Sequence, residues 1–259
     1  MDIGIGNVVL IIVGLLLAIF VHEGGHFSIA KIAGIKVFEF AVGLGPKVFK
    51  KVKNNTTYSF RLLPLGGYVL IASRMVVKEL KKTGEAQYQN IHKSQLLDEQ
   101  KWWVKIIFFL AGITFNFLFA VFLALFIDYL VYKRWVFDYL ANQAGKGIWK
   151  LFEELFTGNI FIKTKSQISS IVGSTVHAAE TTDQIRWFYF YFLNLSLIMF
   201  NLLPIPPLDG YRVLEILFCK FIYKKELKEK TSIKINIVGI IIIVALFLLV
   251  LIADIIKIE

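Results

Sequence analysis

The 259-residue sequence has few cysteines, few prolines and few charged residues. It contains one cysteine, Cys219, and five prolines, and charged residues make up 19% of the chain. A single cysteine forms no internal disulfide, so a disulfide-stabilised scaffold is excluded. The low contents of proline and charge also exclude collagen-like and intrinsically disordered chains, because those classes are rich in one or the other.

Apolar residues, in contrast, are abundant. Hydrophobic residues make up 57% of the chain and aromatic residues 15%, with a mean hydropathy of +0.66. A bilayer span needs about 20 mostly apolar residues, and we predict four, at about residues 3–35, 104–132, 186–210 and 235–256. The first span has no basic region before it and no small-residue cleavage site after it, so we expect it to stay in the mature protein.

The net charge of +10 is concentrated in two of the segments between the spans. Residues 31–105 contain 14 Lys or Arg and 5 Asp or Glu, and residues 212–234 contain 7 and 3; residues 133–186 contain 7 and 5. Because basic loops stay in the cytoplasm, both strongly basic segments are predicted inside and both termini outside. This distribution accounts for the charge through orientation and contact with the lipid bilayer, so we expect no nucleic-acid partner.

A short β-structure is predicted between the first two spans. Asn54 and Asn55 form a turn signal, and residues 56–62 alternate between polar and apolar side chains, as in a half-buried strand. We therefore predict an all-α polytopic membrane protein, with four transmembrane helices and a small membrane-associated β-hairpin between helices 1 and 2. Residues 1–259 are expected to form a single domain, with a cytoplasmic β-loop region at about 36–103 and a short outside loop at about 133–185.

Ionisable residues interrupt the first apolar span with the pattern H-E-x-x-H at His22, Glu23 and His26. Residues four apart share one face of a helix, so both imidazoles can ligate one metal, and Glu23 can take a proton from a water bound there. Such residues are costly inside a membrane, so they indicate a functional site. The alternative is a polar cluster that holds neighbouring helices together.

A third ligand is predicted at Asp209. Three prolines at positions 204, 206 and 207 break the third span just before it, which is tolerated at membrane depth only where the backbone faces protein or a wet cavity. A carboxylate at that point is suited to complete a three-ligand zinc site. The alternative is that Asp209 caps a helix beginning near Gly210.

Taken together, the two motifs resemble those of the site-2 protease family of intramembrane zinc metalloproteases, more closely its bacterial regulator of sigma-E protease branch. The zinc-binding motif of the family matches His22, Glu23 and His26, and its N-x-x-P-x-P-x-L-D-G motif begins at Asn201 and includes Asp209. The resemblance implies that Zn²⁺ is held by His22, His26 and Asp209, with Glu23 as the catalytic acid and base.

Smaller motifs add to the resemblance. Residues 61–69, which include Gly66 and Gly67, look like the membrane-associated β-loop of the family, and residues 111–117 are similar to a second-helix motif that contains Asn116. We expect Asn116 and Asn201 to bind the oxyanion or the substrate backbone, unless each makes an interhelical hydrogen bond. An edge strand at about 59–70 would pair with an extended substrate, unless it packs against its own loop.

The resemblance implies hydrolysis of peptide bonds within or near transmembrane segments. The expected substrates are single-span membrane proteins or signal-peptide remnants, and the expected location is the bacterial plasma membrane, with the active site toward the cytoplasm. Members of this branch usually carry a PDZ domain in the outside loop, and residues 133–185 are too few to hold one. Two other interpretations are a metal or proton-coupled transporter and a scaffold that binds membrane helices without cutting them.

Overall fold

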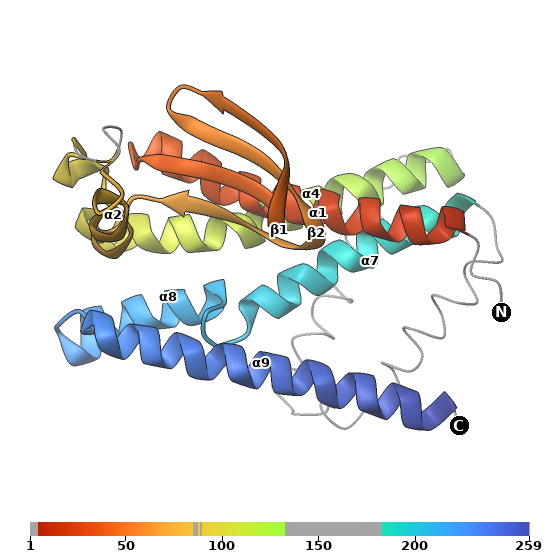
Figure 1. Ribbon diagram of the computed structural model, residues 1–259. Helices are drawn as coiled ribbons and strands as arrows, with labels where there is room; N and C mark the ends of the chain where they lie inside the picture. Colours follow the sequence, from red (N-terminus) through yellow and green to blue (C-terminus); the bar gives the residue numbers. More distant parts are fainter. Residues whose placement is uncertain (1–4, 85–87, 89, 133–182, 259) are drawn as a thin grey trace.

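The computed structural model describes residues 5–84, 88, 90–132 and 183–258, and it consists of long helices with one small antiparallel sheet (Figure 1). The long helices are α1 (Ile5–Ile32), α4 (Trp102–Tyr132), α7 (Asp183–Leu202) and α9 (Glu229–Ile258). The shorter elements are α2 (Arg74–Lys81), the 3-10 turns η1 (Lys93–Gln95) and η2 (Leu97–Glu99), α8 (Asp209–Leu217) and the π-helical segment η3 (Phe218–Tyr223). The prediction of a mostly helical chain with a small β-structure after the first long helix is confirmed. The predicted outside loop, with its expected lack of a PDZ domain, falls on residues 133–182, outside the described residues.

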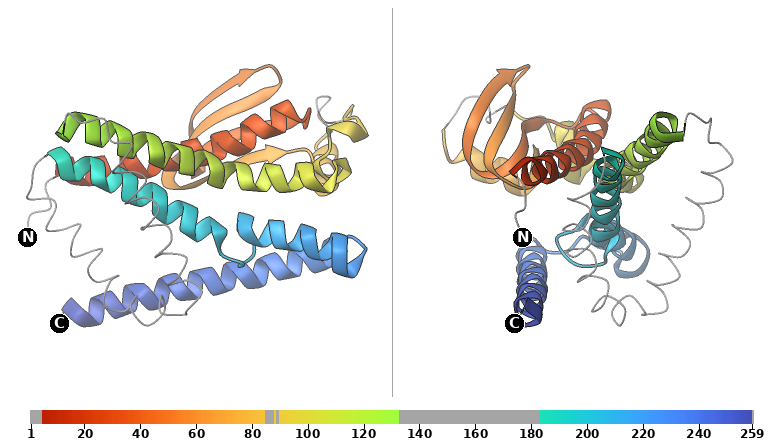
Figure 2. Two further views of the ribbon diagram at one scale, coloured as in Figure 1. Left: turned by 180° about the vertical axis from the view of Figure 1, so that it is seen from behind. Right: turned by 90° about the vertical axis from the view of Figure 1, so that its right-hand side faces the viewer.

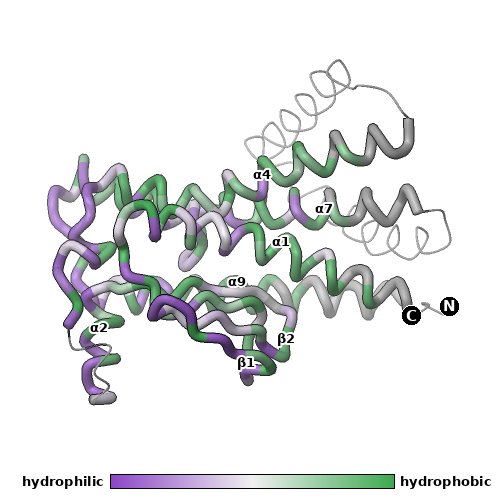
Figure 3. The backbone as a smooth tube through the Cα atoms, turned by 90° about the horizontal axis from the view of Figure 1, so that it is seen from above, coloured by the Kyte–Doolittle hydropathy of each residue, from purple (hydrophilic) through white to green (hydrophobic). Residues whose placement is uncertain are grey.

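Two helical stretches in the described part of the chain are long and apolar enough to cross a membrane. These stretches are Ile12–Ile32 in α1 and Trp102–Leu123 in α4, and α7 contains a shorter apolar stretch, Leu193–Leu202. Figure 3 shows hydrophobic residues along these helices, whereas hydrophilic residues gather around α2 and the sheet. On α1, four of the exposed apolar side chains recur every three or four residues and form one stripe, which suits contact with lipid; these four are Val9, Val13, Leu17 and Phe20.

Helix α1 lies at the centre of the contacts between the elements. It packs against α4, α7 and both strands of the sheet, while α4 also contacts α7 and α8. The right-hand view in Figure 2 shows α1 between the sheet and α4, and in Figure 1 α8 follows the end of α7 and runs alongside α9. The central position of α1 matters because it carries the H-E-x-x-H residues.

The sheet is a hairpin of two long strands, β1 (Val37–Lys53) and β2 (Thr56–Ile71), that run antiparallel. Asn54 and Asn55 join them with φ angles of 51° and 55°. This left-handed conformation is tolerated by asparagine and matches the twist of a tight two-residue hairpin turn. The predicted turn is therefore confirmed, and the strands extend well beyond the segment with alternating polarity.

The two strands also fold over on themselves, which places their inner part against α1. Phe40 in β1 is paired both with Val69 and with Tyr58 of β2, so the first half of β1 is flanked on both sides by parts of β2. The Phe40 ring packs edge-on against Phe20 and Phe27 of α1, with centroids 5.7 and 5.4 Å apart. These aromatic contacts attach the sheet to the turns of α1 on either side of the H-E-x-x-H residues.

A buried carboxylate holds the folded strands together. Glu39 Oε1 accepts hydrogen bonds from Ser59 Oγ at 2.7 Å and Arg61 Nη2 at 2.9 Å, and Lys47 Nζ lies 3.0 Å away. Burial by itself would raise the pKa of Glu39, but the hydrogen bonds from Ser59, Lys47 and Arg61 outweigh it and hold the pKa below its ordinary value. The charged form of Glu39 therefore stabilises the fold.

We expect Glu39→Gln to weaken the folded sheet by about 1–3 kcal/mol at pH 7, because Lys47 and Arg61 lose their shared acceptor charge. The pKa of Glu39 is lower in the folded than in the unfolded protein. The contribution of its charge to the free energy of unfolding is therefore complete above the unfolded pKa of about 4.3, and it is lost as the pH falls through the folded-state pKa. Hydrogen exchange of the strands should show a difference between the variant and the wild type at pH 7 that shrinks below about pH 4. Glu79→Gln, on an exposed carboxylate paired with Lys82, is the control; a difference for Glu39→Gln that does not change with pH would contradict the role of the charge.

Candidate metal centre

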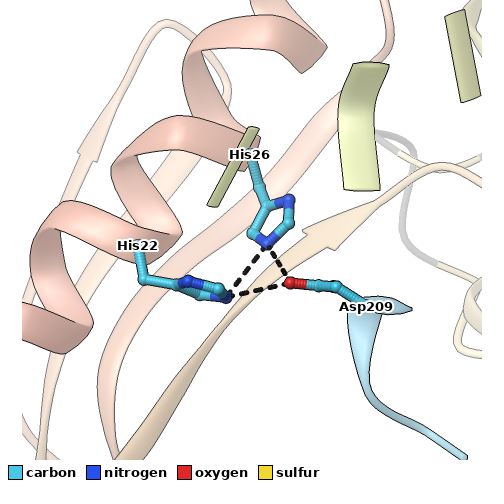
Figure 4. Close-up of side chains that lie close together, drawn as sticks. All are labelled: His22, His26 and Asp209. Carbon is cyan, nitrogen blue, oxygen red and sulfur yellow. Dashed lines mark hydrogen bonds and ion pairs between the residues drawn. The ribbon is translucent and has the colours of Figure 1, made fainter. Parts of the chain in front are cut away.

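Three side chains from two distant elements meet at one point (Figure 4). His22 and His26 lie one turn apart on α1, and Asp209 is the first residue of α8. Asp209 Oδ2 lies 3.1 Å from His22 Nε2 and 3.2 Å from His26 Nε2, and the two Nε2 atoms are 3.2 Å apart. The structure thus brings together the three residues that the sequence predicts as ligands.

The three donor atoms fit a tetrahedral zinc ion. With metal–ligand distances of about 2.0 Å, the ligand atoms of a regular tetrahedron are about 3.3 Å apart, close to the distances among His22, His26 and Asp209. Asp209 Oδ2 is buried and makes no hydrogen bond within the described part of the chain, although it faces two imidazole nitrogens. Three electron-pair donors directed at one point are better satisfied by a shared cation than by one another.

One of the imidazoles is held with its metal-facing nitrogen free. His26 Nδ1 lies 2.8 Å from the backbone carbonyl oxygen of Phe108 on α4 and donates its hydrogen there. In the neutral ring the proton is then on Nδ1, so Nε2 keeps its lone pair and faces Asp209. A hydrogen bond of this kind is what orients histidine ligands in metal sites.

Asp209 reaches the histidines because the third apolar segment is interrupted. Helix α7 ends at Leu202, three prolines follow between residues 204 and 207, and the helix resumes at Asp209 as α8. The residue before it, Leu208, is the extended N-cap, and no side chain caps this helix. The structure therefore places Asp209 inside the first turn of α8, with its carboxylate beside the imidazoles, instead of in a capping position.

Helix α4 approaches the site closely because it carries a glycine there. A Cβ atom at Gly112 would lie 2.5 Å from His26 Nε2 and 2.6 Å from His22 Cε1, closer than any real contact allows. Small residues commonly permit such close packing between membrane helices. The bare backbone of α4 at Gly112 thus forms one wall of the site.

Strand β2 passes over Glu23. A Cβ atom at Gly67 would lie 3.0 Å from Glu23 Cγ and 2.9 Å from Ile19 Cγ2. The neighbouring Gly66 has a φ angle of 96°, in the left-handed region. The predicted catalytic residue and the two predicted substrate-binding glycines therefore lie in the same part of the molecule.

The predicted asparagines lie in different surroundings. Asn116 is completely buried on α4, and its Nδ2 lies 3.5 Å from His22 Nδ1. Asn201 Nδ2 donates to the carbonyl oxygen of Leu197 in its own helix, 3.0 Å away. The sequence reasoning missed Asn194, whose Nδ2 donates to the backbone oxygen of Asn116 at 2.6 Å and which is also completely buried. A single asparagine within an apolar stretch is the signal that could have identified it.

Comparison with known families agrees with this geometry. Residues 10–246 match peptidase family M50. The chain belongs to this family. The predicted membership of the site-2 protease family is thereby confirmed, since the match covers most of the chain and includes both the H-E-x-x-H residues of α1 and the start of α8.

Several proteins named as zinc metalloproteases are similar to parts of the chain. The zinc metalloprotease RasP of Shouchella clausii is 57% identical over 54 residues, 21% of this chain and 13% of the relative. RasP of Geobacillus kaustophilus is 59% identical over 54 residues, 21% and 13% respectively. FN1322 of Fusobacterium nucleatum, also named as a zinc metalloprotease, is 37% identical over 131 residues, which are 50% of this chain and 34% of the relative. The aligned segments thus span only a minor part of the length of these relatives.

We expect Gly112→Ala to weaken zinc binding by more than about tenfold, because the added methyl group would displace α4 or both imidazoles. Zinc affinity is measured by competition with a chelator in detergent. Gly24→Ala is the matched control, since a Cβ atom there meets nothing within 4 Å and alanine favours the helix by about 1 kcal/mol. Zinc binding of Gly112→Ala at the affinity of Gly24→Ala would show that the close approach of α4 is not needed.

We also expect Asp209→Ala to weaken zinc binding by more than the roughly 10–100-fold that loss of an outer partner costs, because a ligand itself is removed. The same competition measurement tests this expectation. Unchanged affinity would mean that the third ligand is another residue.

Proposed function

We propose that this protein is an intramembrane zinc metalloprotease that hydrolyses peptide bonds within or near transmembrane segments. The observation that supports this function best is the meeting of Asp209 with His22 and His26, the two histidines of the H-E-x-x-H motif. The membership of family M50 and the zinc metalloprotease names of the relatives point the same way.

The proposed membrane arrangement has four spans, carried by α1, α4, α7 and α9, within a single domain of residues 1–259. The apolar stretches in α1, α4 and α7 support it, as do the basic residues between the spans. The start of α1 and the end of α9 lie at the same end of the molecule (Figures 1 and 2), in agreement with two termini outside the cell. The sheet and the hydrophilic α2 are then cytoplasmic, and the site faces that side of a bacterial plasma membrane.

In the proposed mechanism His22, His26 and Asp209 hold the zinc ion. Bound there, zinc supplies Lewis acidity, which makes a water more acidic and polarises the carbonyl group of the substrate. Glu23 accepts the proton of the attacking water and then delivers it to the nitrogen of the departing amine, so that one carboxylate serves as base and acid. Its position against Gly67 of β2 places this proton transfer beside the sheet.

The proposed substrates are single-span membrane proteins or signal-peptide remnants. A transmembrane helix uses its carbonyl groups in its own hydrogen bonds, so the segment to be cut has to be extended before attack. The second half of β2, with Gly66 and Gly67, passes next to Glu23. The pairing partners that the described residues give to segment 67–71 all belong to β1, so its opposite edge can pair with an extended substrate.

We expect Glu23→Gln to abolish cleavage of a single-span test substrate by the purified protein while about one zinc per chain is retained, because the amide cannot accept a proton but is not a ligand. Glu79→Gln, which alters an exposed glutamate of α2, is the matched control and should cleave like the wild type. Equal cleavage by Glu23→Gln and the wild type would exclude the role of Glu23. Absence of cleavage by the wild type, together with metal flux into liposomes, would instead favour a transporter.

A further inference from the structure

Asn116 lies directly behind one of the two histidines. It follows Gly112 by one turn of α4, its side chain is completely buried, and its Nδ2 atom is 3.5 Å from His22 Nδ1. The Nδ1 atom is the ring nitrogen that does not face Asp209, since Asp209 Oδ2 is near Nε2. The amide thus contacts His22 on the side away from the metal position, where a proposed oxyanion would not lie.

The amide orientation with Nδ2 toward the ring is inconsistent with metal binding. If Nδ2 donates to His22 Nδ1, the proton of the neutral ring is on Nε2, and a protonated Nε2 cannot be a ligand. In the same orientation Asn116 Oδ1 is buried and makes no hydrogen bond in the described part of the chain. Turning the amide by 180° exchanges its oxygen and nitrogen, so that Oδ1 accepts from the ring and Nε2 keeps its lone pair.

We propose that Asn116 is a positioning residue whose amide oxygen accepts the Nδ1 hydrogen of His22 and keeps Nε2 free for zinc; this inference rests on the zinc site of the proposed function. It gives the two histidines equivalent outer partners on α4. His26 donates its Nδ1 hydrogen to the Phe108 carbonyl oxygen at 2.8 Å, and His22 donates its own to Asn116, two turns further along the same helix.

The contact between α4 and α7 supports this arrangement. Asn194 of α7 donates to the backbone oxygen of Asn116 at 2.6 Å, which fixes α4 at the turn that carries the amide. Asn194 Oδ1 is also buried and has no hydrogen bond within the described residues. Polar side chains thus extend from α7 through α4 to the imidazole on α1.

The first test compares two replacements of nearly the same size. Asn116→Asp keeps an oxygen acceptor and has no donor when ionised, whereas Asn116→Leu has neither. We expect Asn116→Leu to weaken zinc binding by about 10–100-fold, and Asn116→Asp to bind zinc at least as tightly as the wild type. Asn236→Leu, which removes a partly buried amide on α9, a helix that carries none of the predicted ligands, is the matched control and should change zinc affinity by less than about threefold. If Asn116→Asp loses as much affinity as Asn116→Leu, or if Asn116→Leu binds normally, the proposal is wrong.

A second measurement uses the wild-type protein and no variant. Nitrogen-15 NMR of the zinc-loaded protein, labelled at histidine, reports which nitrogen of His22 carries the proton and how fast that hydrogen exchanges with water. We expect the proton on Nδ1 in slow exchange, because Asn116 accepts it, and a proton on Nε2 or a freely exchanging Nδ1 proton would overturn the proposal even if Asn116→Leu does not fold. Neither readout uses cleavage, so failure of the proposed protease activity is seen separately from failure of this inference.

Discussion

The fold depends on one constraint, which is that three buried electron-pair donors from α1 and α8 converge on one point among apolar helices, where the proposed zinc ion would satisfy them. A carboxylate or imidazole in such surroundings costs several kcal/mol when nothing satisfies it. Asp209 Oδ2 has two imidazole nitrogens within 3.2 Å but no hydrogen bond in the described residues. The interruption of α7, which releases Asp209, and the glycine at position 112, which admits the imidazoles, are both consequences of this requirement.

The sheet is the second part of the same arrangement. Glu39 of β1 lies at the centre of the folded strands and accepts hydrogen bonds from Ser59 and Arg61 of β2. The next residue of β1, Phe40, packs its ring on α1. Because α1 carries the histidines, any displacement of the sheet would move β2 relative to Glu23. The buried charge at Glu39 therefore helps to set the distance between segment 67–71 of β2, the proposed substrate-binding edge, and Glu23, the proposed catalytic carboxylate.

Local sequence signals were sufficient for the features that depend on short spacing. The four-residue spacing of His22 and His26 and the turn at Asn54 and Asn55 follow from helix and hairpin geometry, and the structure has both. Asp209 could be proposed because proline cannot continue a helix.

The remaining features depend on contacts between distant segments. The start of β1 at Val37 lies in an almost continuous apolar run without alternation, because that part of the strand is covered on both sides. The double pairing of Phe40 and the role of Gly112 depend on which segments become neighbours, which no local pattern encodes. Asn194 was missed for the same reason, since an asparagine in an apolar stretch indicates a hydrogen bond but does not identify its partner.

Helix α8 is held at both ends, but by interactions of unequal strength. Beyond the carboxyl end of α8, Glu226 pairs with Arg74 of α2 at 2.8 Å and with Lys105 of α4 at 3.3 Å. These pairs join the segment that follows α8 to α2 and α4. Glu226 and Arg74 are more than half exposed, and such ion pairs contribute only about 0–1 kcal/mol and are screened by salt. At its amino end Asp209 is nearly buried beside the two histidines, and a bound metal there stabilises only the folded arrangement that holds all three ligands. The position of α8 is therefore determined mainly at Asp209, so the proposed metal would stabilise the helix arrangement on which its own site depends.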